Sequence, residues 1–128
     1  MNFDWSEYLY LAQEATNQVP SKPYSEEARL RAAISRGYYA AFCETRRYLT
    51  SNTIYIALSG KDTHWDIINQ FISSSDGARR TIGRDLLRLF ENRKKADYDD
   101  VYPDLSLATA QALVNAAQQV IIRLSRLK

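Results

Sequence analysis

Apolar residues recur at every third or fourth position along almost the whole chain, which is the spacing of one face of an α-helix. Strict alternation of apolar and polar residues, which marks a half-buried strand, never lasts for more than a few positions. Only four glycines and three prolines interrupt the pattern. We therefore expect an all-α bundle of about five helices, and the length of 128 residues fits a single domain over 1–128.

Capping residues and helix breakers predict where each helix begins and ends. Asp4, with Phe3 and Tyr8 placed as a hydrophobic staple, is typical of a helix start, and so is Ser25. The second helix is apolar nearly all round at YYAAFC, so we expect it at the centre of the bundle. The predicted helices run from about Asp4 to the prolines of NQVPSKPYS, from Ser25 to about Ser51, from Thr63 to SSSDG, from about Ala78 to Tyr98, and from about Leu105 to Leu127.

Composition changes this picture little. Hydrophobic residues make up 45% of the chain and charged residues 25%, as in ordinary soluble globular proteins. The single cysteine, Cys43, excludes an internal disulfide and fits a reducing compartment. Asp4 and Glu7 stand where a secretory signal needs positive charge, and no apolar run reaches the roughly 18 to 20 residues of a membrane helix. We expect a cytoplasmic protein that does not enter a membrane.

The fourth predicted helix concentrates positive charge. Seven basic residues lie between Arg79 and Lys95, against two acidic ones. Arg80, Arg84 and Arg88 recur at every fourth position and form a stripe on the exposed face, which can follow a nucleic-acid backbone. The alternative interpretation is a helix face that is merely solvated.

Arg93 stands on the inner face of the same helix. Leu86 and Phe90 belong to the apolar face of this helix. Steps of three and four residues along the same face lead from Phe90 to Arg93 and then to Asp97. An arginine at such a position is almost never unpaired. Either it forms an ion pair with Asp97 one turn later, or it binds a phosphate, and both alternatives stay open.

A second stripe, on the second helix, mixes arginines with small residues. Arginines beside small residues predict a close helix approach or a polar groove, in which Tyr39 would lie beside Arg36. The alternative is that the aliphatic stems of the arginines pack at the edge of the core. Cys43, in the apolar middle of this helix, is expected to be a buried, unreactive thiol. The members of the stripe are Arg29, Ala33, Arg36, Ala40, Cys43 and Arg47.

Few other residues suggest chemistry. His64 is the only histidine and stands near a helix start, where capping or packing is expected rather than catalysis. The sequence holds no ordered spacing of metal ligands, no glycine-rich phosphate loop and no nucleophile elbow. We therefore expect no metal and no cofactor.

Two segments resemble the HEPN superfamily, in particular its small stand-alone prokaryotic members. The segments are RAAISRGYYAAFCETRRYL and, after a helix beginning THWDIINQF, LLRLFENRKKADYDD. The shared motifs are an arginine before paired tyrosines and, about 55 residues later, an arginine followed by Ala-Asp-Tyr. The likeness runs from about Phe3 to the last helix. The matching positions are Arg36, Tyr38, Tyr39, Arg93, Ala96, Asp97 and Tyr98.

This resemblance implies an up-and-down helical bundle, often a homodimer, and a toxin-like component of a toxin–antitoxin pair with a small nucleotidyltransferase. Many members are metal-independent endoribonucleases whose signature is an arginine and a histidine with four to six residues between them. The arginine would hold the scissile phosphate and the histidine would move a proton, in a site shared by two copies. The resemblance makes Arg93 and Tyr98 the candidate catalytic residues. The residues expected to hold RNA are Arg36, Lys94, Lys95, Arg80, Arg84 and Arg88.

The histidine of that signature is missing, because the available positions hold Tyr98, Asp99 and Asp100. An ordinary tyrosine has a pKa near 10, about three units too high for a base near neutrality, whereas that of histidine is near 6.5. General acid–base help is worth about 10² to 10⁴-fold. We therefore expect weak RNA cleavage or binding alone.

The alternative interpretation is a non-catalytic helical module that binds a nucleotidyltransferase or its nucleotide. Arg93 and Asp97 would then be structural, and Tyr98 or Tyr102 would be a candidate acceptor of a nucleotidyl group. In some relatives the acceptor tyrosine lies two positions after the histidine, where this chain has Asp100.

Overall fold

The computed structural model describes residues 3–17, 25–52 and 63–127, and the proline-containing break predicted after the first helix falls largely outside them. Within these residues the chain forms five α-helices and no strand, which confirms the all-α prediction. None of these helices combines the length and the apolar character that a membrane crossing requires. The helices are α1 (Glu7–Asn17), α2 (Glu26–Asn52), α3 (Thr63–Ile72), α4 (Gly77–Tyr98) and α5 (Leu107–Arg126).

Two helices begin later than predicted, and side-chain hydrogen bonds explain both differences. The Asp4 carboxylate accepts hydrogen bonds from the backbone N and the hydroxyl of Ser6, at 3.1 and 2.6 Å, so a turn precedes α1 and the helix begins at Glu7. Ser106 is the N-cap of α5, because its hydroxyl accepts from the backbone N of Thr109 at 3.0 Å.

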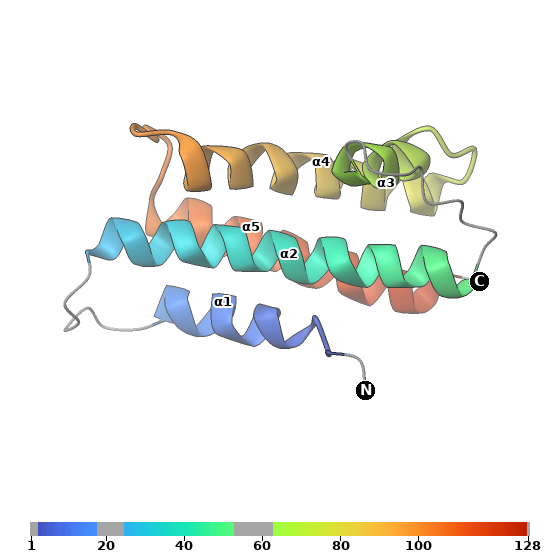
Figure 1. Ribbon diagram of the computed structural model, residues 1–128, viewed down its shortest axis with the longest axis horizontal. Helices are drawn as coiled ribbons and strands as arrows, with labels where there is room; N and C mark the ends of the chain where they lie inside the picture. Colours follow the sequence, from blue (N-terminus) through green and yellow to red (C-terminus); the bar gives the residue numbers. More distant parts are fainter. Residues whose placement is uncertain (1–2, 18–24, 53–62, 128) are drawn as a thin grey trace.

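α2 runs through the middle of the bundle, as its apolar centre predicted (Figure 1). α1 lies along one side of α2, while α4 and the short α3 lie along the other, and α5 packs behind. α1, α2, α4 and α5 alternate in direction along the chain. Tyr38 and Ala41 at the centre of α2 have no exposed surface, and they share one core with Leu86 of α4 and Leu113 of α5.

Arg29 and Arg47 of the α2 stripe hold α1 in place through its backbone. The Arg29 side chain, only 6% exposed, donates to the carbonyl of Ala15 near the end of α1. Arg47 donates to the carbonyl of Phe3, ahead of α1. Because α1 packs directly on α2, the stripe marks a close helix approach, which is one of the alternatives that the sequence left open.

Arg31 of α2 caps the C-terminal end of α4, a contact that no sequence pattern indicated. Its Nη1 lies 3.0 Å from the carbonyl oxygen of Ala96 and 2.7 Å from that of Asp99, while its Nε pairs with Glu27 at 3.0 Å. The last carbonyls of a helix have no partner within that helix. One guanidinium from another helix therefore provides hydrogen-bond donors for the carbonyls at the end of α4.

We expect Gly83→Ala to lower the free energy of unfolding by about 1 to 3 kcal/mol, the usual cost of overpacking. A Cβ at Gly83 would lie 2.5 Å from the backbone N of Ile72, so α3 and α4 would have to separate. The gain in helix propensity, about 1 kcal/mol, does not offset this cost. At Gly77 a Cβ would meet only the flexible Arg80 side chain, at 3.5 Å, so Gly77→Ala should be neutral or stabilising. Urea unfolding of both variants tests this, and equal effects would contradict it.

We also expect Arg31→Ala to destabilise the protein by about 2 kcal/mol, because hydrogen bonds from a charged donor are worth about 1.5 to 3 kcal/mol. Hydrogen exchange should speed up in the last turn of α4, whose carbonyls lose their cap. Arg88→Ala is the control, since Arg88 is exposed on the same helix and should change stability by less than about 0.5 kcal/mol. Unchanged exchange at the end of α4 in Arg31→Ala would rule out the capping role.

Candidate functional site

A hollow of about 260 Å³ is lined by residues of α1, α2, α3 and the turn before α1, and we call it the aromatic pocket. Four of its residues recur on α2 at intervals of three, four and three positions, so they occupy one face of that helix. α1 and α3 both flank α2, but their described residues do not contact one another, which leaves this face of α2 open between them. The pocket is lined by Trp5, Tyr8, Arg36, Tyr39, Phe42, Cys43, Arg46 and His64.

His64 of α3 forms one wall of the aromatic pocket by stacking on its neighbours. Its ring lies 4.3 Å from that of Phe42 at an interplanar angle of 18°, and 5.7 Å from that of Phe90 at 20°. Its Nδ1 is hydrogen-bonded to the hydroxyl of Tyr38. The packing role predicted for His64 is confirmed, although the sequence did not indicate that the same ring faces a pocket.

Two arginines at the pocket carry uncompensated positive charge. The guanidinium of Arg36 lies 5.1 Å from the ring centre of Tyr8, and that of Arg46 lies 5.9 Å from the ring of Trp5. In the described part of the chain, neither guanidinium forms an ion pair or a hydrogen bond. These charges are therefore available to an anion.

Arg93 lies at the edge of this site, and its charge is already compensated. Its Nε is 2.9 Å from Oδ2 of Asp97, although the two atoms are not aligned as a hydrogen bond. Its Nη2 donates to the hydroxyl of Tyr39, which lines the pocket. The side chain is 13% exposed, and Ser35 also donates to Asp97, at 3.2 Å. Of the two alternatives for Arg93, the ion pair is present, while phosphate binding stays a prediction.

The other predicted site residues of α4 divide between two sides of the helix. Arg84, Arg88 and Lys95 are exposed, have no ion pair among the described residues, and form what we call the cationic face. Successive helical residues turn by about 100°, so Arg84 and Arg93 point in roughly opposite directions. Arg80 is half-buried and donates to the carbonyl of Ser74 at 3.0 Å.

Lys94 and Tyr98 each contact a side chain that borders the aromatic pocket. The Lys94 ammonium is 4.6 Å from the ring of Phe90, which in turn stacks on His64. Tyr98 is 71% exposed, and the guanidinium of Arg93 lies 5.5 Å from its ring. The structure therefore places Arg93 and Lys94 against the ring cluster of Tyr39, Phe90 and His64, whereas Arg36 lies against Tyr8.

Two further residues of interest are held in unreactive settings. Burial raises the pKa of the Cys43 thiol, and the positive charge of nearby Arg46 opposes this shift, so the thiol stays protonated near neutrality. Burial also raises the pKa of Tyr102, with a further contribution from the Asp104 carboxylate. The Tyr102 hydroxyl donates to Asn92, so it is not free to receive a group.

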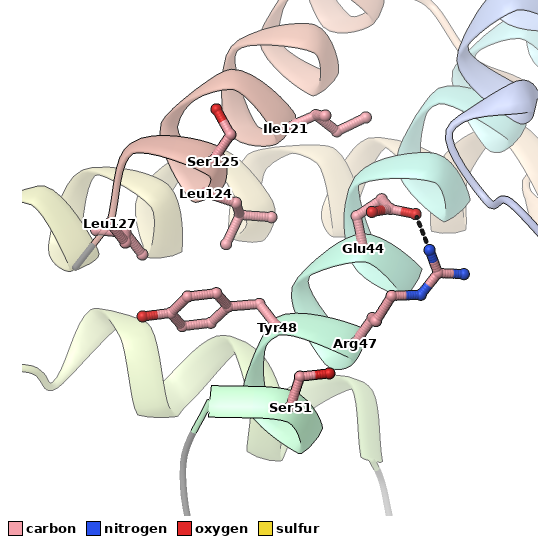
Figure 2. Close-up of a pocket in the computed structure, with 8 residues that line it drawn as sticks. All are labelled: Glu44, Arg47, Tyr48, Ser51, Ile121, Leu124, Ser125 and Leu127. Carbon is pink, nitrogen blue, oxygen red and sulfur yellow. Dashed lines mark ion pairs between the residues drawn. The ribbon is translucent and has the colours of Figure 1, made fainter.

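A larger hollow, of about 420 Å³, lies between the ends of α2 and α5 (Figure 2). Its arginine, Arg47, is paired with Glu44 at 3.3 Å, and much of the remaining lining is aliphatic, including Ile121 and Leu124. Size favours this hollow, but chemistry favours the aromatic pocket, because only the latter combines rings with uncompensated charge. No group of three or more metal-ligating side chains occurs in the residues that the structure describes.

Comparison with known proteins finds no matching family model, no similar curated protein and no similar solved structure. The resemblance to the HEPN superfamily therefore rests on the two sequence motifs alone.

We expect Asp97→Asn to lower the free energy of unfolding by about 1 to 2 kcal/mol. The Arg93–Asp97 pair is partly buried, so its loss should lie between the 0.2 to 1 kcal/mol of exposed pairs and the roughly 3 to 5 kcal/mol of buried ones. Asp99→Asn removes the same charge two residues later, at an exposed side chain without an ion pair among the described residues. Urea unfolding should show a clear loss only for Asp97→Asn, and equal losses would mean that the pair contributes nothing.

Proposed function

We propose that this chain is a HEPN-like, toxin-like RNA-acting protein that binds single-stranded RNA through the cationic face of α4. The observation that carries the proposal is that Arg84, Arg88 and Lys95 are exposed on one side of a single helix, without an ion pair in the described residues. From Arg84 to Lys95 the helix rises by about 16 Å, enough to contact several phosphates of a strand.

The contact between the two HEPN-like motifs supports the family assignment within this proposal. Tyr39 of the α2 motif and Arg93 of the α4 motif are far apart in the sequence, yet the Arg93 guanidinium donates to the Tyr39 hydroxyl and lies 5.0 Å from its ring. Residues of two motifs that form one cluster are more consistent with a common site than with two unrelated matches.

We propose RNA binding as the main activity of this chain, with RNA cleavage weak or absent. The charge of Arg93 is compensated by Asp97, and the position expected for a histidine holds the exposed Tyr98. Both features disfavour rapid phosphodiester cleavage, since the first reduces the attraction of a phosphate and the second removes a proton carrier that works near neutrality. Neither feature affects the cationic face.

The affinity for a labelled single-stranded RNA, measured by fluorescence anisotropy between about 50 and 200 mM salt, tests the proposal. Each phosphate contact on a single strand contributes about 0.7 to the slope of log affinity against log salt. We expect Arg84→Gln/Arg88→Gln to reduce this slope by about 1.4 and to weaken binding by about 10- to 30-fold near 0.1 M salt.

The matched control is Arg123→Gln/Arg126→Gln, which removes two exposed arginines from α5 and leaves α4 intact. This control should change the slope much less. Equal losses in both double variants would show that the RNA senses only net charge, and the cationic face would not be a site. To measure cleavage, the same RNA is incubated with the protein without metal and then separated by electrophoresis. Any product that persists in Arg93→Ala is not made by a site that contains Arg93.

A further inference from the structure

We propose that a groove between α1 and α5 binds an extended, uncharged peptide segment of another protein through its backbone. The groove is a hollow of about 360 Å³ where these two helices pack together, and we call it the amide groove. It shares no residue with the cationic face or the aromatic pocket, so the inference does not depend on the RNA binding proposed above. Its lining residues are Gln13, Thr16, Asn17, Gln111, Val114 and Asn115.

The side walls of the amide groove consist of four carboxamides, two from each helix. A carboxamide carries N–H donors and an acceptor oxygen, which is the combination that a peptide group both offers and requires. In the part of the chain that the structure describes, none of these four side chains has a hydrogen-bond partner. Their donors and acceptors are therefore available to a ligand. The four residues are Gln13 and Asn17 of α1 and Gln111 and Asn115 of α5.

The spacing of the carboxamides fits an extended chain. The two carboxamides of each helix lie four residues apart, which corresponds to a rise of about 6 Å along the helix. In an extended chain every second residue presents its N–H and C=O to the same side, at intervals of about 6.6 Å. Because the two helices form the two walls, alternate residues of such a chain face α1 and the residues between them face α5.

The buried members of the lining, Thr16 and Val114, form the floor of the amide groove. The Thr16 hydroxyl donates to the carbonyl of Gln13 at 2.7 Å, so its hydrogen atom is already used within α1. The floor therefore presents mainly methyl groups. We expect the bound segment to place small or β-branched side chains there, because a large ring would hold its backbone away from the carboxamides.

The lining disfavours other classes of ligand. None of the described residues of the amide groove is ionisable, so a phosphate would find no positive charge there. None of them is aromatic, so a nucleobase would have no ring on which to stack. A partner helix pairs its backbone groups internally, whereas an extended segment has N–H and C=O groups that need partners. An extended segment therefore makes the fullest use of the carboxamides.

Titration of the isotope-labelled protein with a short peptide, followed by NMR, tests the inference. The probe is a pentapeptide of alternating valine and serine, acetylated and amidated at its ends so that it carries no charge. We expect the side-chain NH₂ signals of the four groove residues to shift saturably. N-methylation of two alternate peptide nitrogens removes the donors that face one wall, and it should weaken binding at least about tenfold.

A pair of double variants separates the amide groove from carboxamides elsewhere on the surface. Gln111→Met/Asn115→Leu removes the hydrogen-bonding groups of the α5 wall at nearly constant size, and it should weaken peptide binding at least about tenfold. The matched control, Gln70→Met/Gln119→Met, removes two exposed carboxamides outside the groove and should leave binding unchanged. Circular dichroism of each variant confirms that the helices are retained.

Four outcomes would overturn the inference. They are the absence of saturable shifts, equal binding of the N-methylated and unmodified peptides, equal losses in the two double variants, and shifts of the same size with maltose. Maltose is uncharged and has no peptide group, so equal shifts would show that the amide groove takes neutral polar ligands in general. A failure of RNA binding in Arg84→Gln/Arg88→Gln would leave the peptide result unchanged, so the two proposals can fail separately.

Discussion

Hydrogen bonds from arginines of α2 to backbone carbonyls of other segments hold this bundle in its arrangement. Arg29 and Arg47 bind carbonyls of α1 and of the segment before it, and Arg31 binds carbonyls at the end of α4. Carbonyls at a helix end lose water on burial and need a replacement donor. Because these donors all belong to one central helix, α2 positions both α1, which carries one wall of the aromatic pocket, and the end of α4, which carries Arg93.

The cationic side chains fall into two groups, those paired with an acceptor of the protein and those without one. This difference decides which of them can bind a ligand. The formal net charge of +2 does not reveal this difference between paired and unpaired cations. Arginines that hold carbonyls or a carboxylate contribute to the fold, and removing them costs stability. Among the described residues, cations without such a partner are available to phosphates, and several of them lie at two places, the aromatic pocket and the cationic face. The cations at these two places are Arg36, Arg46, Arg84, Arg88 and Lys95.

Interactions within one helix could be predicted from the sequence, and interactions between helices largely could not. The three-four spacing predicted the five helices, and the same spacing gave the Arg93–Asp97 pair as one of two alternatives for Arg93. The carbonyl contacts of Arg31 have no sequence signal, because every residue has a carbonyl and only the packing of α2 on α4 selects these. The aromatic pocket likewise depends on how three segments meet, although the spacing of Arg36, Tyr39, Cys43 and Arg46 could have drawn attention to its floor.

The close approach of α3 to α4 at Gly83 has a consequence for molecular recognition. With no side chain at this position, the backbone of α3 rests directly against α4, so the helix that carries His64 has little freedom to shift. That wall of the aromatic pocket is therefore preorganised, and an incoming ligand need not order it. Such a wall selects by shape rather than by adaptation, and we expect it to discriminate flat molecules from bulky ones through their fit.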